Sequence, residues 1–236
     1  MRLSIVIPCY NEKFSIPLIL ERFNQVIGKR KIDVILVNNG STDGSEKVFD
    51  ELLPHYSFAH LVVVKENKGY GYGILQGLKA AEGDYIGWTH ADMQTDPKDV
   101  VRAYNYLCKT NNKNLFLKGS RKGRPIAEVF FTKGMSLFES VYFGVPLSDI
   151  NGQPNIFPRE FYEKWSNPPL DFSLDLYVFY SARKHHLNIV RFPVEFTNRQ
   201  FGSSKWNRGL KSKVKFIKKT IKFSYDLKRR EKESER

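Results

Sequence analysis

Three side chains able to bind a metal follow an apolar stretch near the middle of the chain. Residues 84–88 form a short apolar and aromatic run, and His90, Asp92 and Gln94 come next at alternate positions. In extended backbone this spacing places all three side chains on one side. An imidazole, a carboxylate and an amide at the carboxyl end of a strand suit a divalent cation that holds a diphosphate. The alternative is an ordinary polar loop between a strand and the helix after Pro97.

Several cations in the second half of the chain are candidates for binding phosphate. Arg199 and Lys205 bracket a Gly-Ser-Ser turn, where backbone N–H groups and a hydroxyl could join the two charges on a phosphate. Arg121, Arg124 and Lys133 also stand out, although single cations are most often solvated surface residues. The chain has no helix-turn-helix, zinc or RNA-binding signature, so we expect no nucleic-acid partner.

Two carboxylates are candidates for a general base. Asp149 lies in the polar segment 148–154, and Asp175 lies between Leu174 and Leu176 in a predicted helix. A carboxylate at either position could accept a proton from a hydroxyl. The position of Asp175 is equally consistent with an ordinary helix residue.

The elements that must position these residues alternate regularly along the chain. Strand, loop and helix in repeated order indicate an α/β fold with a parallel, doubly wound sheet, whose functional loops gather at the carboxyl ends of the strands. Pro193 within the last predicted strand indicates an edge position. The predicted strands are 3–7, 33–37, 61–64, 84–88, 115–118 and 188–196. The predicted helices include 15–27, 74–81, 98–107, 126–143 and 171–184.

The glycines at 69, 71 and 73 have two interpretations. A run of alternate glycines could cradle a phosphate, but its spacing does not match the dinucleotide-binding fingerprint. Close packing at the entry of a helix is the interpretation that the pattern favours.

Length and composition indicate one large α/β domain over residues 1–206, followed by a tail over 207–236. The 236 residues are enough for one sizeable core. The two cysteines, Cys9 and Cys108, lie far apart, which favours a reducing compartment. Met1 leads directly into a strand without a signal-peptide pattern, and no apolar run reaches the ~18 residues of a membrane span. We therefore expect a soluble or peripheral protein.

The tail carries most of the basic charge. The chain has a net charge of +13, of which residues 206–236 contribute +8. Apolar residues form a stripe at helical spacing, with lysines along one flank, and this pattern is typical of a helix that binds an anionic membrane surface. The alternative is a helix that packs the stripe against the domain. The stripe consists of Leu210, Val214, Ile217, Ile221 and Tyr225.

The polar loops together resemble the family 2 inverting glycosyltransferases of GT-A fold. The segments that carry the resemblance are 5–12 (IVIPCYNE), 37–44 (VNNGSTDG) and 90–94 (HADMQ). Within that family the sequence is most similar to the dolichol- or polyprenyl-phosphate sugar synthases, through 92–94, 118–121 (KGSR) and 199–205 (RQFGSSK). The resemblance covers about residues 3–206.

This resemblance implies a role for each matching residue. Pro8, Tyr10 and Glu12 would line the nucleoside pocket, and Asn38 would contact the base. Lys68 and Gly69 would lie near the nucleotide. Asp92 and Gln94, with His90 beside them, would bind Mg²⁺ or Mn²⁺ at the diphosphate. Arg199, Ser204 and Lys205 would close over the diphosphate. The residues implied for the acceptor phosphate are Arg121, Lys133 and Ser136.

The sequence departs from the family pattern at three places. Asn38 stands where the family usually has Asp, which bears on the identity of the base. His90 replaces the first acidic residue of the metal motif, which removes a hard oxygen ligand and favours Mn²⁺, a weaker site or a dispensable metal. The helix at 174–177 reads LDLY where the synthases carry amide and acidic residues.

The implied reaction is a single displacement, with inversion, from a nucleotide-sugar donor to a lipid-linked acceptor at the inner membrane surface. The metal, Arg199 and Lys205 would neutralise charge on the departing nucleoside diphosphate. A lipid phosphate is already ionised and needs no base. The second hypothesis is transfer to a sugar hydroxyl in polysaccharide or glycolipid synthesis, which would need Asp149 or Asp175 to take the proton. A degenerate nucleotide-sugar-binding protein without turnover is the third hypothesis, based on Asn38 and His90.

Overall fold

A computed structural model describes residues 1–110, 112–199, 201 and 210–234. The chain forms two compact units, one made of Met1–Arg124 with Asn151–Phe201 and the other of Pro125–Ile150 with Gly202–Arg236. The predicted boundary between residues 206 and 207 falls outside the described residues and stays a prediction. Among the helices in the described ranges, none combines the length and apolar character needed to span a bilayer.

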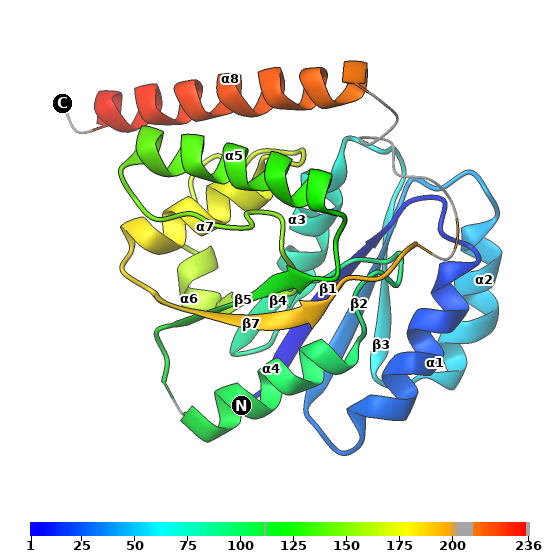
Figure 1. Cartoon of the computed structure of the whole chain (residues 1–236). Coiled ribbons are helices and arrows are strands. Elements are labelled where there is room, and N and C mark those ends of the chain that lie inside the picture. Colours follow the sequence, from blue (N-terminus) through cyan, green and yellow to red (C-terminus); the bar gives the residue numbers. More distant parts are fainter. Residues whose placement is uncertain (111, 200, 202–209, 235–236) are drawn as a thin grey trace. The chain divides into compact units, whose positions relative to one another are not determined.

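A seven-stranded, mostly parallel sheet forms the centre of the first unit (Figure 1). Its strand order is β3-β2-β1-β4-β6-β5-β7, and only β6 runs antiparallel to its two neighbours. The α/β prediction and the edge position of the strand that contains Pro193 are confirmed. The prediction missed β6, a strand of four residues, which is too short to show a periodic pattern. The strands are β1 (Leu3–Cys9), β2 (Ile32–Asn39), β3 (Ala59–Val64), β4 (Tyr85–Trp88), β5 (Leu115–Lys122), β6 (Asn155–Pro158) and β7 (Asn188–Glu195).

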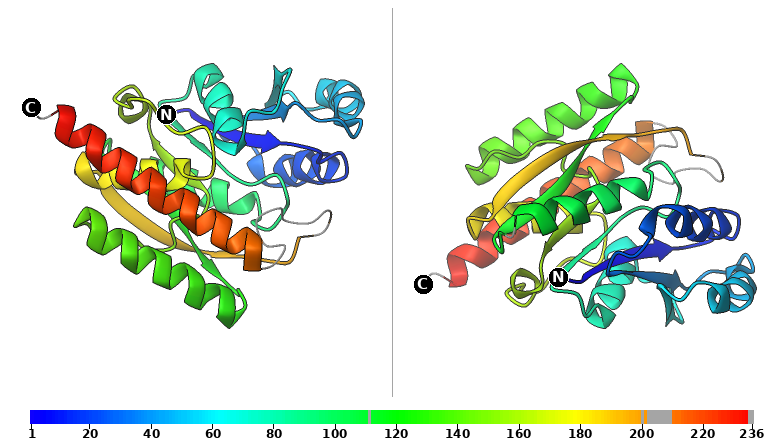
Figure 2. Two further views of the ribbon diagram at one scale, coloured as in Figure 1. Left: turned by 90° about the horizontal axis from the view of Figure 1, so that it is seen from above. Right: turned by 90° about the horizontal axis from the view of Figure 1, so that it is seen from below.

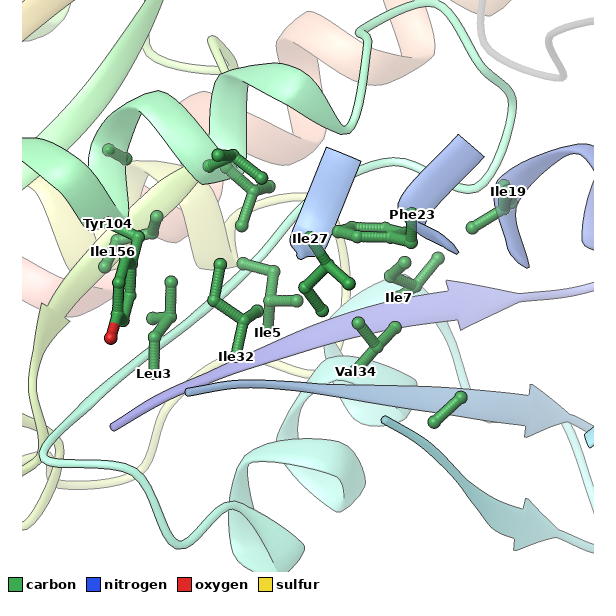
Figure 3. Close-up of a cluster of buried hydrophobic side chains, with 14 of the residues drawn as sticks. Leu3, Ile5, Ile7, Ile19, Phe23, Ile27, Ile32, Val34, Tyr104 and Ile156 are labelled. Atoms are coloured by element: carbon green, nitrogen blue, oxygen red, sulfur yellow. The ribbon is translucent and has the colours of Figure 1, made fainter. Parts of the chain in front are cut away.

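Helices cover both faces of this sheet. Apolar side chains at helical spacing bring α1, α2 and α4 onto one face, where Phe23 and Tyr104 meet Leu3, Ile5 and other strand residues (Figure 3). The helices of the first unit are α1 (Ser15–Ile27), α2 (Ser45–Leu52), the short 3-10 helix η1 (Leu53–His55), α3 (Tyr70–Ala80), α4 (Lys98–Thr110), α6 (Arg159–Tyr162) and α7 (Leu174–Lys184).

The glycines of α3 serve close packing on the opposite face of the sheet. A Cβ on Gly73 would lie 2.7 Å from the amide nitrogen of Asn39, and one on Gly77 would lie 2.4 Å from the side chain of Val6. Because no side chain separates α3 from β1 and β2, the helix backbone lies directly on the strands. The packing interpretation of the glycine run is therefore confirmed. The helix also begins at Tyr70, four residues before its predicted start.

The described part of the second unit contains two helices, α5 (Ile126–Phe143) and α8 (Leu210–Ser234), which run side by side (Figures 1 and 2). Ser224 of α8 donates a hydrogen bond of 2.8 Å to the buried carboxylate of Glu139 in α5. One turn further along both helices, the ammonium of Lys228 lies 4.6 Å from the ring centroid of Tyr142. These two contacts set the register of the pair.

Candidate functional site

An ion-pair cluster joins three loops at the carboxyl edge of the sheet. One Nη of Arg199, which follows β7, lies 2.6 Å from a carboxylate oxygen of Asp92, which follows β4. The other Nη lies 3.4 Å from Glu12, which follows β1. Asp92 is only 4% exposed, so the guanidinium is the counter-charge for a carboxylate that is nearly excluded from water. The cluster brings together three residues that the sequence predicted for the donor site.

The loops after β4 and β7 are held together by a short ladder of hydrogen bonds. The backbone N–H of Thr197 donates to the carbonyl of Gln94 at 2.9 Å, and the side-chain amide of Gln94 donates back to the carbonyl of Thr197 at 3.1 Å. The backbone N–H of Gln94 also donates to Asp92 at 3.1 Å. Gln94 therefore fixes both the Asp92 carboxylate and the segment that carries Arg199.

The loops after β1 and β2 are joined in the same way. The side-chain oxygen of Asn38 accepts the backbone N–H of Ser41 at 3.1 Å, which closes the turn after β2. The hydroxyl of Ser41 accepts the backbone N–H of Asn11, and the side chain of Asn11 accepts the backbone N–H of Thr42. An amide at Asn38 is thus compatible with an ordered loop at the predicted nucleoside pocket.

The electrostatics of Glu12 reflect its place in the cluster. Burial raises the pKa of Glu12, whereas the hydrogen bond from Ser15 and the charge of Arg199 oppose the rise. The nearby charge of Asp92 raises the pKa further. Two carboxylates that share one guanidinium leave a net negative charge, so a second cation would bind favourably at this site.

His90 differs from the other residues of the loop because its burial disfavours the charged form of the imidazole. Burial lowers the pKa of His90, and this effect is opposed by the charges of Asp92 and Asp175. Its Nε2 atom is buried and has no hydrogen-bond partner among the described residues. A neutral imidazole with an unused nitrogen can bind a metal or a hydroxyl of a ligand.

The residues of this loop would supply only part of the coordination shell of a cation. No group of three or more His, Cys, Asp or Glu residues in the described ranges forms a metal cage. Asp92 offers a carboxylate, with Gln94 and His90 beside it. Mg²⁺ is commonly held by one or two carboxylates plus substrate phosphates, and Mn²⁺ also accepts imidazole. The set therefore suits a metal that arrives with the donor.

Asp175 belongs to a buried polar network of the first unit. It is 2% exposed, and its carboxylate accepts a hydrogen bond of 2.9 Å from the side-chain amide of Asn155. The oxygen of that amide in turn accepts a hydrogen bond of 2.7 Å from the ammonium of Lys118. Burial raises the pKa of Asp175, and the charge of Lys118 opposes the rise. The predicted helical position of Asp175 is confirmed, and its carboxylate already has partners.

The other predicted donor residues occupy the expected loops of the first unit. Pro8 and Tyr10 are partly buried at the end of β1. The ammonium of Lys68 lies 5.7 Å from the ring centroid of Tyr72. Gly69 has a φ of 125°, and a Cβ at this position would clash with the carbonyl oxygen of Leu170. Ser204 and Lys205 lie outside the described residues.

The predicted acceptor residues are divided between the two units. Arg121 belongs to the first unit, where its guanidinium lies 5.2 Å from the ring centroid of Phe196. Lys133 and Ser136 belong to the second unit, as does the candidate base Asp149. Ser136 is buried in α5 and Lys133 is exposed. The roles of these residues at the acceptor remain predictions.

The sequence pattern assigned no role to Lys118, Asn155 or Gln153, all of which are fully or almost fully buried. Asn155 and Gln153 lie in or beside β6, the strand that the periodicity does not reveal. A lysine within an apolar strand is unusual, because a charge on a buried strand needs partners. That irregularity at Lys118 is the signal in the sequence that points to a buried network.

Comparisons with known proteins identify the family. The sequence profile of glycosyl transferase family 2 matches residues 4–152. An undecaprenyl-phosphate 4-deoxy-4-formamido-L-arabinose transferase of Proteus mirabilis is 33% identical over 105 residues, which cover 43% of this chain and 32% of that protein. The protein of the same name from Pectobacterium atrosepticum is 35% identical over 109 residues, which cover 44% of this chain and 32% of that protein. The matches thus span about a third of the length of these relatives.

Solved structures share the fold. A glucosyl-3-phosphoglycerate synthase from Mycobacterium tuberculosis, in complex with Mn²⁺, UDP-glucose and phosphoglyceric acid, aligns with a TM-score of 0.71 at 18% identity, covering 93% of this chain and 77% of that one. A mannosyltransferase from Pyrobaculum calidifontis, in complex with GDP-mannose and Mn²⁺, aligns with a TM-score of 0.66 at 19% identity. The alignment covers 85% of this chain and 58% of that one. The profile match spans more than half of the sequence, and the chain therefore belongs to glycosyl transferase family 2.

Proposed function

We propose that this protein transfers a sugar from a nucleotide-sugar donor, with inversion, to a polyprenyl phosphate or related lipid-linked acceptor. The observation that carries the proposal is the cluster of Arg199, Asp92 and Glu12, which three loops assemble at the carboxyl edge of a mostly parallel sheet. Ligands of such sheets bind at this edge. The names of the matching relatives, undecaprenyl-phosphate sugar transferases, support the class of acceptor.

The chemistry assigned to the cluster is stabilisation of a departing nucleoside diphosphate. Arg199 supplies a planar guanidinium that can bind two phosphate oxygens. Asp92, with Gln94 and His90 beside it, would hold Mg²⁺ or Mn²⁺, and the bound cation would neutralise developing negative charge on the diphosphate. The Mn²⁺ in the solved structures supports a divalent metal.

The state of Asp175 favours a phosphate acceptor over a hydroxyl acceptor. A general base must reach the proton that it removes. The Asp175 carboxylate is buried and receives the hydrogen bond of Asn155. A lipid phosphate is already ionised, so it can attack the anomeric carbon without a base. The second candidate, transfer to a sugar hydroxyl, would use Asp149 as the base.

The second unit carries apolar side chains suited to a membrane surface. On α5 the exposed fractions are 88% for Ile126, 81% for Phe130, 67% for Leu137 and 76% for Val141, and this spacing places all four on one side of the helix. On α8 the apolar residues exposed by 40% or more are Val214, Ile221 and Tyr225. The exposed lysines of α8 include Lys215, Lys218 and Lys222.

This combination of apolar and basic side chains supports peripheral binding to an anionic bilayer at its inner face. If this row of exposed apolar residues had no partner, it would promote self-association of the protein in water. The same surface would bring a lipid-linked acceptor and the enzyme together.

The direct test is product formation by the purified full chain with each of UDP-, GDP-, CDP- and TDP-sugars, polyprenyl phosphate and Mn²⁺ or Mg²⁺. We expect one nucleotide class to yield a lipid-linked sugar, and Asp92→Ala to reduce the rate by at least ~10²-fold. Asp50→Ala, an exposed carboxylate of α2, is the matched control and should keep full activity. Product only with a glycolipid hydroxyl would favour the second candidate. Donor binding without any product would establish the degenerate binder.

A further inference from the structure

The fully buried ammonium of Lys118 connects three parts of the first unit. Its Nζ donates to the carbonyl of Gly152 at 2.9 Å and to the side-chain oxygen of Asn155 at 2.7 Å, and it lies 5.2 Å from the ring centroid of Phe179. Lys118 is 0% exposed. Lysines are almost never fully buried unless they are paired, because removing an ammonium from water is costly. This lysine therefore needs an anionic partner.

Asp175 is that partner, and Asn155 bridges the two charges. The amide of Asn155 accepts from Lys118 with its oxygen and donates to Asp175 at 2.9 Å with its nitrogen. Lys118 and Asn155 are also paired in register between β5 and β6. The charge of Lys118 is the largest influence that lowers the pKa of Asp175 against the effect of burial. An ammonium, an amide and a carboxylate thus form one hydrogen-bonded row.

The row lies on strands whose ends lead into the loops of the candidate site. Asn155 is paired with Trp88 at the end of β4, two residues before His90. Lys118 precedes Arg121 by three residues on β5. The backbone of Gly119, between them, donates to the carbonyl of Pro154 at 3.0 Å. A Cβ on Gly119 would lie 2.0 Å from the carbonyl oxygen of Gln153, so the two backbones are in direct contact.

We propose that Lys118 is a positioning residue for the transfer reaction: paired with Asp175 through Asn155, it fixes the 152–155 segment against β5 and so sets the position of Arg121. Asp175 then acts as the counter-charge of Lys118 and not as a general base. The activity readouts of this inference rest on the proposed function, whereas the pairing itself is tested by stability alone.

The stability test is a double-mutant cycle on the full chain with Lys118→Met, Asp175→Asn and the double variant. Each single change leaves one buried charge without its partner, and we expect each to lower the melting temperature by about 5 to 10 °C. The double variant removes both charges and should recover at least half of that loss. Lys122→Met, an exposed lysine on the same strand, is the matched control and should change the melting temperature by less than about 2 °C. Additive losses in the double variant would overturn the pairing.

The activity test separates positioning from general-base catalysis. With polyprenyl phosphate as acceptor, we expect Asp175→Asn, which is nearly isosteric, to lower kcat by about 10-fold and to raise the KM for the acceptor, with the KM for the donor unchanged. Adding Lys118→Met should restore part of kcat. A loss of ~10³-fold or more in Asp175→Asn that the second change does not restore would overturn the positioning role in favour of a base.

The two readouts also distinguish a failure of this inference from a failure of the proposed function. If the wild-type chain forms no product, the proposed function is wrong, but the coupling between Lys118 and Asp175 in the melting temperatures still decides the pairing. If Lys118→Met does not fold, Asp175→Asn and the double variant still report the coupling, because a stable double variant requires that the two charges compensate each other.

Discussion

Arg199 pairs with the carboxylate that a metal would use. Its Nη lies 2.6 Å from Asp92, and the same guanidinium reaches Glu12. Binding of a donor diphosphate with its cation would give Arg199 a new anionic partner and release Asp92. In the proposed function, the ion pair would shield the two carboxylates from solvent cations until a donor binds.

We expect Arg199→Ala to have opposite effects on the metal and on the donor. Without the guanidinium, Asp92 and Glu12 lose their counter-charge, so Mn²⁺ alone should bind several-fold more tightly. The affinity for the nucleotide-sugar should fall by about 10-fold or more, because a charge-assisted phosphate contact is lost. Isothermal titration with Mn²⁺ alone measures the first effect, and titration with the nucleotide-sugar in the presence of Mn²⁺ measures the second. Arg159→Ala, on the short helix α6, serves as the control, and a weaker Mn²⁺ affinity in Arg199→Ala would contradict the competition.

At the scale of elements, the close contact between α3 and the sheet depends on the missing side chains of Gly73 and Gly77. A Cβ at Gly77 would lie 2.4 Å from Val6 and 2.9 Å from Val37. Such distances require α3 or the strands to move. The loop before α3 carries Lys68 and Gly69, so a shift of this helix would also reach the predicted donor site.

We expect Gly77→Ala to reduce the free energy of unfolding by about 1 to 3 kcal/mol through overpacking. Gly134→Ala is the matched control, since Gly134 also lies inside a helix but a Cβ there meets nothing within 4 Å. The control should be stabilised by up to about 1 kcal/mol, as alanine favours helix over glycine. Chemical denaturation of both variants gives the comparison. Equal effects at the two positions would show that the packing of α3 is loose.

The pairing of α5 with α8 should depend on pH through Glu139. Burial raises the pKa of Glu139 from its ordinary value of 4.5 to about 7, against the hydrogen bond from Ser224. Because the folded state holds the proton more tightly, the contribution of this group to stability is complete below pH 4.5 and is lost as the pH rises through about 7. The helix pair should therefore loosen between these values.

Hydrogen exchange of peptides from α5 and α8, corrected for intrinsic rates, tests this expectation. We expect faster exchange at about pH 8 than at about pH 5 in the wild-type chain, on either side of the Glu139 pKa. Glu139→Gln keeps the size and a hydrogen-bonding group without titrating, so its corrected exchange should be independent of pH. A pH dependence that persists in Glu139→Gln would assign the effect to another group.

At the scale of the whole molecule, the exposed apolar row of α5 and the basic side of α8 predict binding to anionic membranes. We expect the full chain to co-sediment with phosphatidylglycerol vesicles and only weakly with phosphatidylcholine vesicles, and to lose binding at high salt. Replacing Phe130 and Leu137 by serine should reduce binding at least ~10-fold, because two apolar side chains that would enter the bilayer are lost with their transfer free energy. Val63→Ser, at an exposed apolar residue of β3, is the control. Unchanged binding in the α5 variant would restrict the membrane role to α8.

The sequence by itself determined the class of fold and the edge where the site lies. Apolar runs such as 3–7 and helical stripes such as Ile16, Ile19 and Phe23 are local patterns, and they locate most of the longer elements within a few residues. Alternation of these elements implies a parallel sheet, and a parallel sheet gathers the ends of its strands. The order of elements along the chain is therefore sufficient to place Glu12 and Asp92 at one edge.

Only the tertiary structure decided which of these residues interact. The partner of Asp92 is Arg199, which lies 107 positions away, and no local pattern encodes a pairing at that separation. The insertion of β6 between β4 and β5 brings Asn155 between Lys118 and Asp175. The strand order depends on the packing of the whole first unit, which no local pattern encodes. For this reason the sequence alone could suggest Asp175 as a base, whereas in the folded chain its carboxylate belongs to a buried hydrogen-bond network.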